Sequence, residues 1–234
     1  MANTYSLDLE AGSSQYAAIA DVSQTGLDLA GDMSAEAWVK FESTPGASGI
    51  YTIISKYQPA SNKSYLFYLY NDAGTLNLRF IGSNDGSTDN TVSVTWTPSV
   101  GTWYHTAVTK SGTTVKFYVN AAQQGTDQTI ANATLFNGTA QFSIGEAGGG
   151  SFFDGLVDDV RMWSDVRTGT EITNNYQVEL AGNEANLVGY WKLNNDYLDE
   201  TANNNDLTAS GSPVFSTDIP SWPGVTNQSY AYFM

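Results

Sequence analysis

The sequence has no cysteine and only one histidine, His105. Disulfides, thiolate zinc sites and thiol nucleophiles are therefore excluded, as is any metal site built from two histidines of one chain. No run of about 18 apolar residues occurs, so we expect no membrane-spanning helix. The first residues lack the basic and apolar regions of a secretion signal, so we expect no signal peptide in this chain.

Basic residues are scarce, with 9 Lys and Arg against 24 Asp and Glu and a formal net charge of −15 at pH 7. Such a chain is repelled by phosphate backbones and anionic lipid headgroups, so we expect neither nucleic acids nor membranes as partners. Hydrophobic residues make up 41% of the chain and charged residues 14%, which is enough to bury a core. Neutral sugars, cations and protein surfaces remain as partners.

Apolar residues recur at every second position along several segments, which is the period of a strand with one buried face. Segments 76–80, 92–96 and 115–119 show this alternation. Segments 51–54 and 65–70 are apolar on both faces, which suits strands of a curved sheet that is covered on both sides. Short turns rich in Asn, Asp and Gly separate the segments.

Only one segment has the features of a helix. Thr168 and Glu171 form a capping-box pattern, and Ile172, Tyr176 and Leu180 follow as an apolar stripe before Gly182. We therefore expect one short helix near residues 168–180. A single helix among many strands predicts an all-β fold in which two antiparallel sheets pack as a jelly-roll sandwich.

Five segments, in order along the chain, resemble the laminin-G-like, concanavalin-A-like domains of the lectin and glucanase superfamily. They are SAEAWVKF at 34–41, IISK at 53–56, WYHTAV to TVKFYVN at 103–120, FSIG to EI at 142–172 (with FDGLVDDVRMW) and YWKL onward at 190–205. The fourth also resembles pentraxins. The resemblance implies a concanavalin-A-like jelly roll, which we expect to span residues 1–218. Residues 219–234 are interpreted as an extension, either a docking tail or an added edge strand.

Sugar recognition requires aromatic rings with amides and acids beside them. We expect such a surface to be lined by aromatic residues of the strands and loops, namely Tyr57, Tyr65, Trp96, Phe152 and Phe153. Phe152 and Phe153 are neighbours next to a glycine-rich loop, so one of the two should face outward.

The resemblance to pentraxins implies calcium ligands in the loop before Ser64 and in the loop after Gly145. Asn62 and Glu146 occupy these positions, and their oxygens are of the kind that Ca²⁺ prefers. Members of this fold also hold a calcium ion that pins the N-terminal strand, and Glu10 and Asp158 are the candidates for it here. Ca²⁺ is therefore the one cofactor that we expect.

Catalysis is not expected. A retaining glycosidase needs two carboxylates about 5 Å apart. Asp158 and Asp159 are adjacent, and alternation along a strand would place them on opposite faces. His105 matches a structural position of the family.

Two roles stay open. The first is a non-catalytic binding or adhesion module that recognises a glycan or a protein through rim loops, at an extracellular or virion surface. The second is a virion structural protein, such as a phage head decoration or tail component. It would self-associate, or dock on a capsid or tail neighbour, through residues 219–234.

Overall fold

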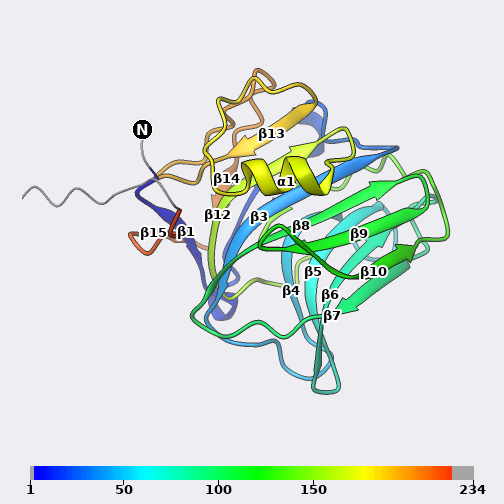
Figure 1. Cartoon of the computed structure of the whole chain (residues 1–234), viewed down its shortest axis with the longest axis horizontal. Coiled ribbons are helices and arrows are strands. Elements are labelled where there is room, and N and C mark those ends of the chain that lie inside the picture. The colour runs from blue at the N-terminus through cyan, green and yellow to red at the C-terminus, as the bar shows by residue number, and fades with distance from the viewer. Residues whose placement is uncertain (1–2, 223–234) are drawn as a thin grey trace, which may run out of the picture.

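The alternating segments form strands that pair into two antiparallel sheets, as predicted (Figure 1). The computed structural model describes residues 3–222. The strands follow one another along the chain as β1 (Ser6–Leu9), β2 (Tyr16–Ile19), β3 (Met33–Phe41), β4 (Ile50–Tyr57), β5 (Lys63–Asp72), β6 (Thr75–Gly82), β7 (Asn90–Thr95), β8 (Trp103–Ser111), β9 (Thr114–Val119), β10 (Ala122–Thr129), β11 (Phe142–Ile144), β12 (Gly155–Trp163), β13 (Leu187–Trp191), β14 (Thr208–Ser210) and β15 (Val214–Ser216).

One sheet has eight strands in the order β10-β9-β8-β3-β12-β1-β15, with β13 paired to the far part of β12. The other has seven strands in the order β14-β2-β11-β4-β5-β6-β7. In this order β11 lies between β2 and β4, although the three strands are far apart in the sequence. Short 3-10 turns, η1 (Ala11–Ser13) and η2 (Asp21–Ser23), flank β2.

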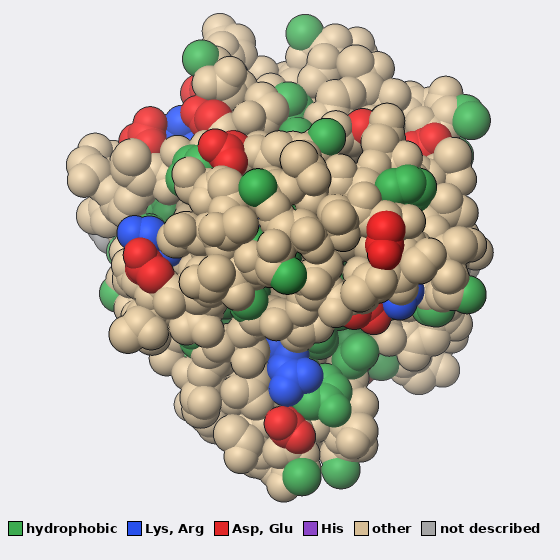
Figure 2. All heavy atoms as spheres, turned by 90° about the vertical axis from the view of Figure 1, so that its right-hand side faces the viewer, with side chains coloured by type: hydrophobic (Ala, Val, Ile, Leu, Met, Phe, Trp, Pro, Cys, Tyr) green, Lys and Arg blue, Asp and Glu red, His purple; other side chains and the backbone are tan. Residues whose placement is uncertain are grey.

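The core lies between the two sheets and is built from the inward positions of both. Val39 and Phe41 of β3 alternate with outward Trp38 and Lys40, and they meet Phe67 and Leu69 of β5 within the same buried cluster. Full burial of one such side chain stabilises the fold by about 1.5–3 kcal/mol. Figure 2 shows one face of the molecule, where charged side chains are scattered and no extended basic patch is visible.

A β-bulge in β12 corrects the expectation for Asp158 and Asp159. Asp158 pairs with Trp38 and Arg161 with Glu36, so one extra residue lies between them on β12. Asp159 occupies this bulge with a φ of 49°, a left-handed conformation. Both carboxylates consequently lie on the outer side of the sheet rather than on opposite faces. Their exposed fractions are 0% and 1%, so no substrate reaches either of them.

The helix α1 (Gly169–Asn175) forms where the capping box predicts it, with reciprocal bonds between Thr168 and Glu171. It ends at Asn175, earlier than expected. The Arg161 guanidinium donates to the carbonyl oxygen of Asn175 at 3.0 Å and to that of Val178, beyond the helix, at 2.7 Å. Leu180 is still buried, but it packs beyond the helix against Trp163 and Tyr190.

The helix covers the outer face of the eight-stranded sheet, in front of β3 and β12 in Figure 1. With seven residues it is the one α-helix of the described chain, and no helix of residues 3–222 is long and apolar enough to cross a bilayer.

The first part of the expected extension, residues 219–222, lies against this same sheet. The ring of Trp222 lies 6.4 Å from that of Trp38, and just before the extension Trp103 Nε1 donates to Asp218 Oδ1 at 2.8 Å. The rest of the expected tail, residues 223–234, lies outside the described residues.

Candidate ligand-binding groove at the rim

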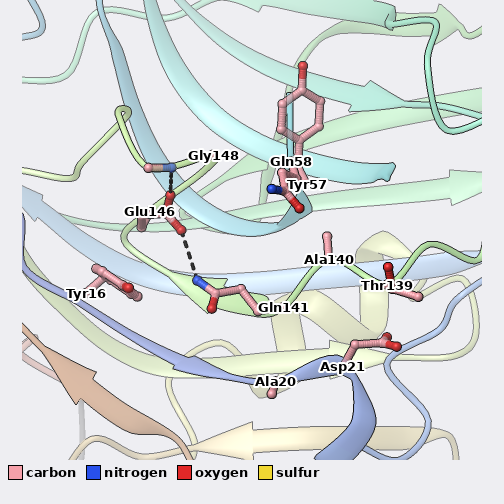
Figure 3. A pocket seen from close by; sticks show the side chains of 11 residues that line it. Tyr16, Ala20, Asp21, Tyr57, Gln58, Thr139, Ala140, Gln141, Glu146 and Gly148 are labelled. Carbon is pink, nitrogen blue, oxygen red and sulfur yellow. Dashed lines mark hydrogen bonds between the residues drawn. The ribbon is translucent and has the colours of Figure 1, made fainter. Parts of the chain in front are cut away.

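A groove of about 500 Å³ opens where β2, β4 and the loops on both sides of β11 come together (Figure 3). The pairing of β11 with both β2 and β4 brings these segments side by side. The groove is lined by aromatic, amide, hydroxyl and carboxylate side chains together with glycine backbone, namely Tyr16, Ala20, Asp21, Tyr57, Gln58, Thr139, Ala140, Gln141, Glu146, Gly148 and Gly149.

Lys56 stabilises one wall of the groove, which is formed by the 138–140 loop and Asp21. Its side chain is fully buried, and its ammonium group donates to the carbonyl oxygens of Gly138 at 2.7 Å and Ala140 at 2.9 Å. It also forms ion pairs with Asp21 at 2.5 Å and Asp28 at 3.0 Å. A buried ammonium with this many partners holds the 138–140 loop and the turn η2 in one geometry.

Glu146 fixes the opposite wall. It is 4% exposed, and its carboxylate accepts from the N–H of Gly149 and, at 3.3 Å, from Nε2 of Gln141. The loop requires glycine at Gly148, where φ is 63° and a Cβ would lie 2.1 Å from Cδ of Pro59. The glycine-rich stretch therefore folds tightly and points a backbone N–H at Glu146.

Two tyrosine rings flank the groove. Tyr57 donates its hydroxyl to both oxygens of Asp89 at 3.1 Å, and Lys63 pairs with the same carboxylate at 3.0 Å. Burial and the neighbouring Asp89 raise the pKa of Tyr57 well above its usual range, so the hydroxyl stays protonated. The ring of Tyr16 packs on Phe152, with centroids 6.2 Å apart.

The aromatic residues expected from the sequence divide into two groups. Tyr57 lines the groove, and Phe152 is partly exposed and supports Tyr16. Phe153 is fully buried against Phe41, so one of the two neighbouring phenylalanines does face outward, as predicted.

Tyr65 and Trp96 are corrected together with Phe153, because all three belong to the core between the sheets. Tyr65 is 1% exposed and donates its hydroxyl to the carbonyl of Leu27 at 3.0 Å. Trp96 is 8% exposed and packs on Phe41. None of the three offers a ring face to a ligand.

The pair of calcium ligands implied by pentraxins does not fit this rim. Asn62 uses its Oδ1 to accept the N–H of Thr139 at 3.4 Å, and it does not line the groove. Both oxygens of Glu146 already accept hydrogen bonds from the protein. A Ca²⁺ site needs several free oxygens, and this part of the rim instead supplies N–H donors.

Glu10 and Asp158 do not meet, which corrects the second calcium expectation. In the pairing of β1 with β12, Leu7 faces Val157 and Leu9 faces Gly155. Asp158 therefore lies about 13 Å along the strands from Glu10. Asp158 is fully buried, accepts from Nδ2 of Asn3 at 2.6 Å, and has a pKa raised far above its usual value by burial.

Glu10 instead joins Asp8 and Glu42. Among residues 3–222, these three form the one group of carboxylates or histidines whose ligand atoms all lie within 4.8 Å of one another. Asp8 is partly buried, and burial together with Glu10 and Asp154 raises its pKa. The oxygens fit a hard divalent cation chemically, although exposed acidic groups also occur without one.

His105 is fully buried, and its Nε2 lies 3.2 Å from Oε2 of Glu36. Burial alone would raise the pKa of Glu36, but the contacts with His105 and Arg161 outweigh it and the pKa lies below its usual value. No ligand reaches this histidine, which agrees with the structural role implied by the family.

Tyr16, Gln58 and Gln141 line the groove but were not expected from the sequence. They lie on three segments that meet only through the pairing of β2, β11 and β4. The polar residues around Phe142 and after Tyr57 carry no local signal that distinguishes them from ordinary loop residues.

The two sheets and the rim groove define a jelly-roll domain of lectin-like architecture. A family model described as the concanavalin A-like lectin/glucanases superfamily matches residues 11–173, which is more than half of the chain. The chain therefore belongs to this superfamily, and the resemblance seen in the sequence is confirmed.

Two solved structures share the fold. One is a Bacteroides ovatus protein described as a candidate carbohydrate binding protein, with 18% identity and a TM-score of 0.69 over 92% of this chain and 60% of that chain. The other is the native heptameric SAP-like pentraxin from Limulus polyphemus, with 15% identity and a TM-score of 0.53 over 91% and 88%. The chain thus spans 60% of the length of the first. Among curated proteins, none matches the chain.

Proposed function

We propose that the protein is a non-catalytic glycan-binding module whose rim groove takes a neutral sugar. The observation that carries this proposal is that two tyrosines, Tyr16 and Tyr57, line the same groove as the amide side chains of Gln58 and Gln141. Aromatic rings stack on the apolar face of a sugar, and amides bond its hydroxyl groups. The volume of about 500 Å³ suits a mono- or disaccharide.

The charge of the site favours a neutral ligand. Asp21 and Glu146 both line the groove and accept hydrogen bonds. Together with the net charge of −15, they repel anionic glycans and attract hydroxyl donors.

The same carboxylates support a binding role without catalysis. A glycosidase needs one carboxyl group that gives up a proton and another that attacks or activates water. Here Asp21 is paired with Lys56, and Glu146 is bonded to Gly149 and Gln141. Membership of a lectin and glucanase superfamily is consistent with sugar binding, and we place the module at an exterior surface, where glycans are displayed.

The test is a glycan array of neutral oligosaccharides probed with the full chain and with Tyr57→Ala. A matched control is Tyr70→Ala, a partly buried tyrosine on the same sheet outside the groove. We expect binding that the first variant weakens on the order of tenfold and the second keeps, and no release of reducing sugar from the bound glycan. Binding that Tyr57→Ala leaves intact would contradict the assignment of the groove, and sugar release would contradict the non-catalytic role.

A virion structural protein is the alternative. Its basis in the sequence is the tail at 219–234, of which residues 219–222 lie on the chain's own sheet. Sedimentation of the full chain and of a chain ending at Trp222 tests it. A silent glycan array together with large assemblies that depend on residues 223–234 would favour this alternative over the binding module.

A further inference from the structure

A second groove, of about 400 Å³, lies on the other sheet. It opens on the outer face of the eight-stranded sheet, between the end of α1 and residues 219–221. Its aromatic lining is Trp38, Trp103 and Tyr176, and its polar lining includes Asn120 and Gln177. It shares no lining residue with the rim groove.

The aromatic rings of this second groove are held by bonds within the protein. Trp38 Nε1 donates to the carbonyl of Tyr176 at 2.8 Å, and the two rings are stacked with centroids 6.0 Å apart and planes at 16°. Trp103 Nε1 donates to Asp218, which is itself paired with Lys40. Both indole nitrogens have a hydrogen-bond acceptor, so the rings are held in place before a ligand arrives. The side chain of Trp103 is nevertheless partly exposed.

The amides of the groove retain hydrogen-bonding capacity. Asn120 uses its Oδ1 to accept the N–H of His105 at 2.9 Å, which fixes the side chain and leaves Nδ2 as a donor. Within residues 3–222, neither this nitrogen nor the carboxamide of Gln177 has a hydrogen-bond partner. Among the described residues that line the groove, none is charged, although the chain carries 24 acidic residues.

We propose that this groove is a second binding site, which takes a neutral sugar stacked on Trp103 with its hydroxyls bonded by Asn120 and Gln177. Fixed aromatic rings beside free amides, without a charge, are complementary to a ligand that has an apolar face and many hydroxyl groups. Since the two grooves belong to different sheets, this site together with the rim groove of the proposed function would let one chain bridge two glycan strands.

The test follows the indole N–H signals of Trp38 and Trp103 in the ¹⁵N-labelled full chain by NMR. The probes are maltose, cellobiose, lactose and xylobiose, each raised to millimolar concentration. We expect at least one sugar to shift both indole signals in a saturable manner. Trp103→Ala should weaken this binding on the order of tenfold, and Gln177→Ala should weaken it by about threefold, as expected for one lost hydrogen bond.

Control variants separate this site from the rim groove. Tyr57→Ala should leave the indole shifts unchanged. If Trp103→Ala folds poorly, Trp103→Phe replaces it as the test; this variant keeps an aromatic ring and should retain part of the affinity. The proposal is overturned if no sugar shifts the two indoles. It is also overturned if Tyr57→Ala abolishes the shifts, because the sugar then occupies only the rim groove. Shifts that appear only after residues 223–234 are deleted would equally overturn it, because the chain's own tail would then be the occupant.

Discussion

The part of the eight-stranded sheet beneath α1 and the rim of the seven-stranded sheet both carry polar side chains, but these side chains have different roles. On the eight-stranded sheet, Glu36, His105, Asp159 and Arg161 are each at most 2% exposed, beneath α1 and the segment that follows it. At the rim of the seven-stranded sheet, Tyr57, Gln58 and Gln141 line an open groove.

The difference comes from what lies on top of each sheet. Where α1 covers the sheet, charged groups are sealed from water and must satisfy one another, so they contribute to the uniqueness of the fold. Where no second layer lies above the strands, similar groups stay available to a ligand. Residue types alone therefore do not identify a site; the covering layer decides between structure and binding.

The largest expected effect is in the sealed region. Arg161→Met removes the guanidinium that pairs with Asp159 and that donates to the carbonyl of Asn175 at the end of α1. A buried carboxylate left without its partner costs about 3–5 kcal/mol. For a chain of this size that lowers the Tm by about 10 °C, as measured by differential scanning calorimetry.

The matched control neutralises the orphaned carboxylate. Arg161→Met combined with Asp159→Asn should recover part of the lost Tm, because the burial penalty of the charge disappears. A single variant as stable as the wild type would show that the network is dispensable, and the contrast between the two faces would lose its energetic basis.

An intermediate loss of stability is expected for Lys56→Met, because Lys56 shares a feature with each of the two regions. Lys56 is buried like the network beneath α1, yet its partners form a wall of the open groove. The variant should lose about 2–3 kcal/mol of unfolding free energy, because buried acceptors lose a charged donor. It should also weaken glycan binding, which a purely structural lysine would not affect at temperatures where the variant is folded. Denaturant titration and calorimetric glycan binding measure the two losses separately.

A smaller effect, confined to binding, is expected at the open rim. Tyr57→Phe removes the hydroxyl that donates to Asp89 but keeps the ring, whereas Tyr57→Ala removes both. We expect Tyr57→Ala to lose on the order of tenfold in glycan affinity, equivalent to about 1.4 kcal/mol, and Tyr57→Phe to lose less. Equal losses in the two variants, measured by calorimetry, would assign the role to the hydroxyl instead of the ring.

The sequence predicted where strands lie along the chain better than it predicted which face of a sheet each side chain occupies. Alternation located β6, β7 and β9, and the capping box located the start of α1, since these signals are local. The segment that became β5 is apolar on both sides, so its period could not show that Tyr65 points into the core while Tyr68 lies on the outer face.

The candidate site was harder to predict for a related reason. The bulge at Asp159 and the pairing of β11 between β2 and β4 arise from tertiary contacts. Tyr57 and Glu146 were found because one is aromatic and the other matches a family position. Tyr16 and Gln141 become neighbours of these residues only when the sheet forms.

The smallest effect is expected at the acidic cluster of Asp8, Glu10 and Glu42, which is neither sealed nor part of a groove. The pKa values of Asp8 and Glu42 are raised by burial and by neighbouring carboxylates. A raised carboxyl pKa adds stability that is fully present below the unfolded pKa and is lost as the pH rises through the folded value. Asp8→Asn should therefore raise the Tm at pH 7 by about 1–3 °C, because one repelling charge is gone.

The pH dependence of this Tm difference provides the control, since the gain should vanish near pH 4, where the carboxyl groups of the wild type take up protons. A Ca²⁺ ion at this cluster, of which only Glu10 was expected from the sequence, is tested in the same scans. Ca²⁺ should raise the Tm of the wild type and not that of Asp8→Asn or Glu10→Gln, because binding to the folded state alone shifts the equilibrium towards it. A wild-type Tm that does not respond to Ca²⁺ would reject the cation at this cluster, whereas a gain in Asp8→Asn that persists at pH 4 would reject charge repulsion as its cause.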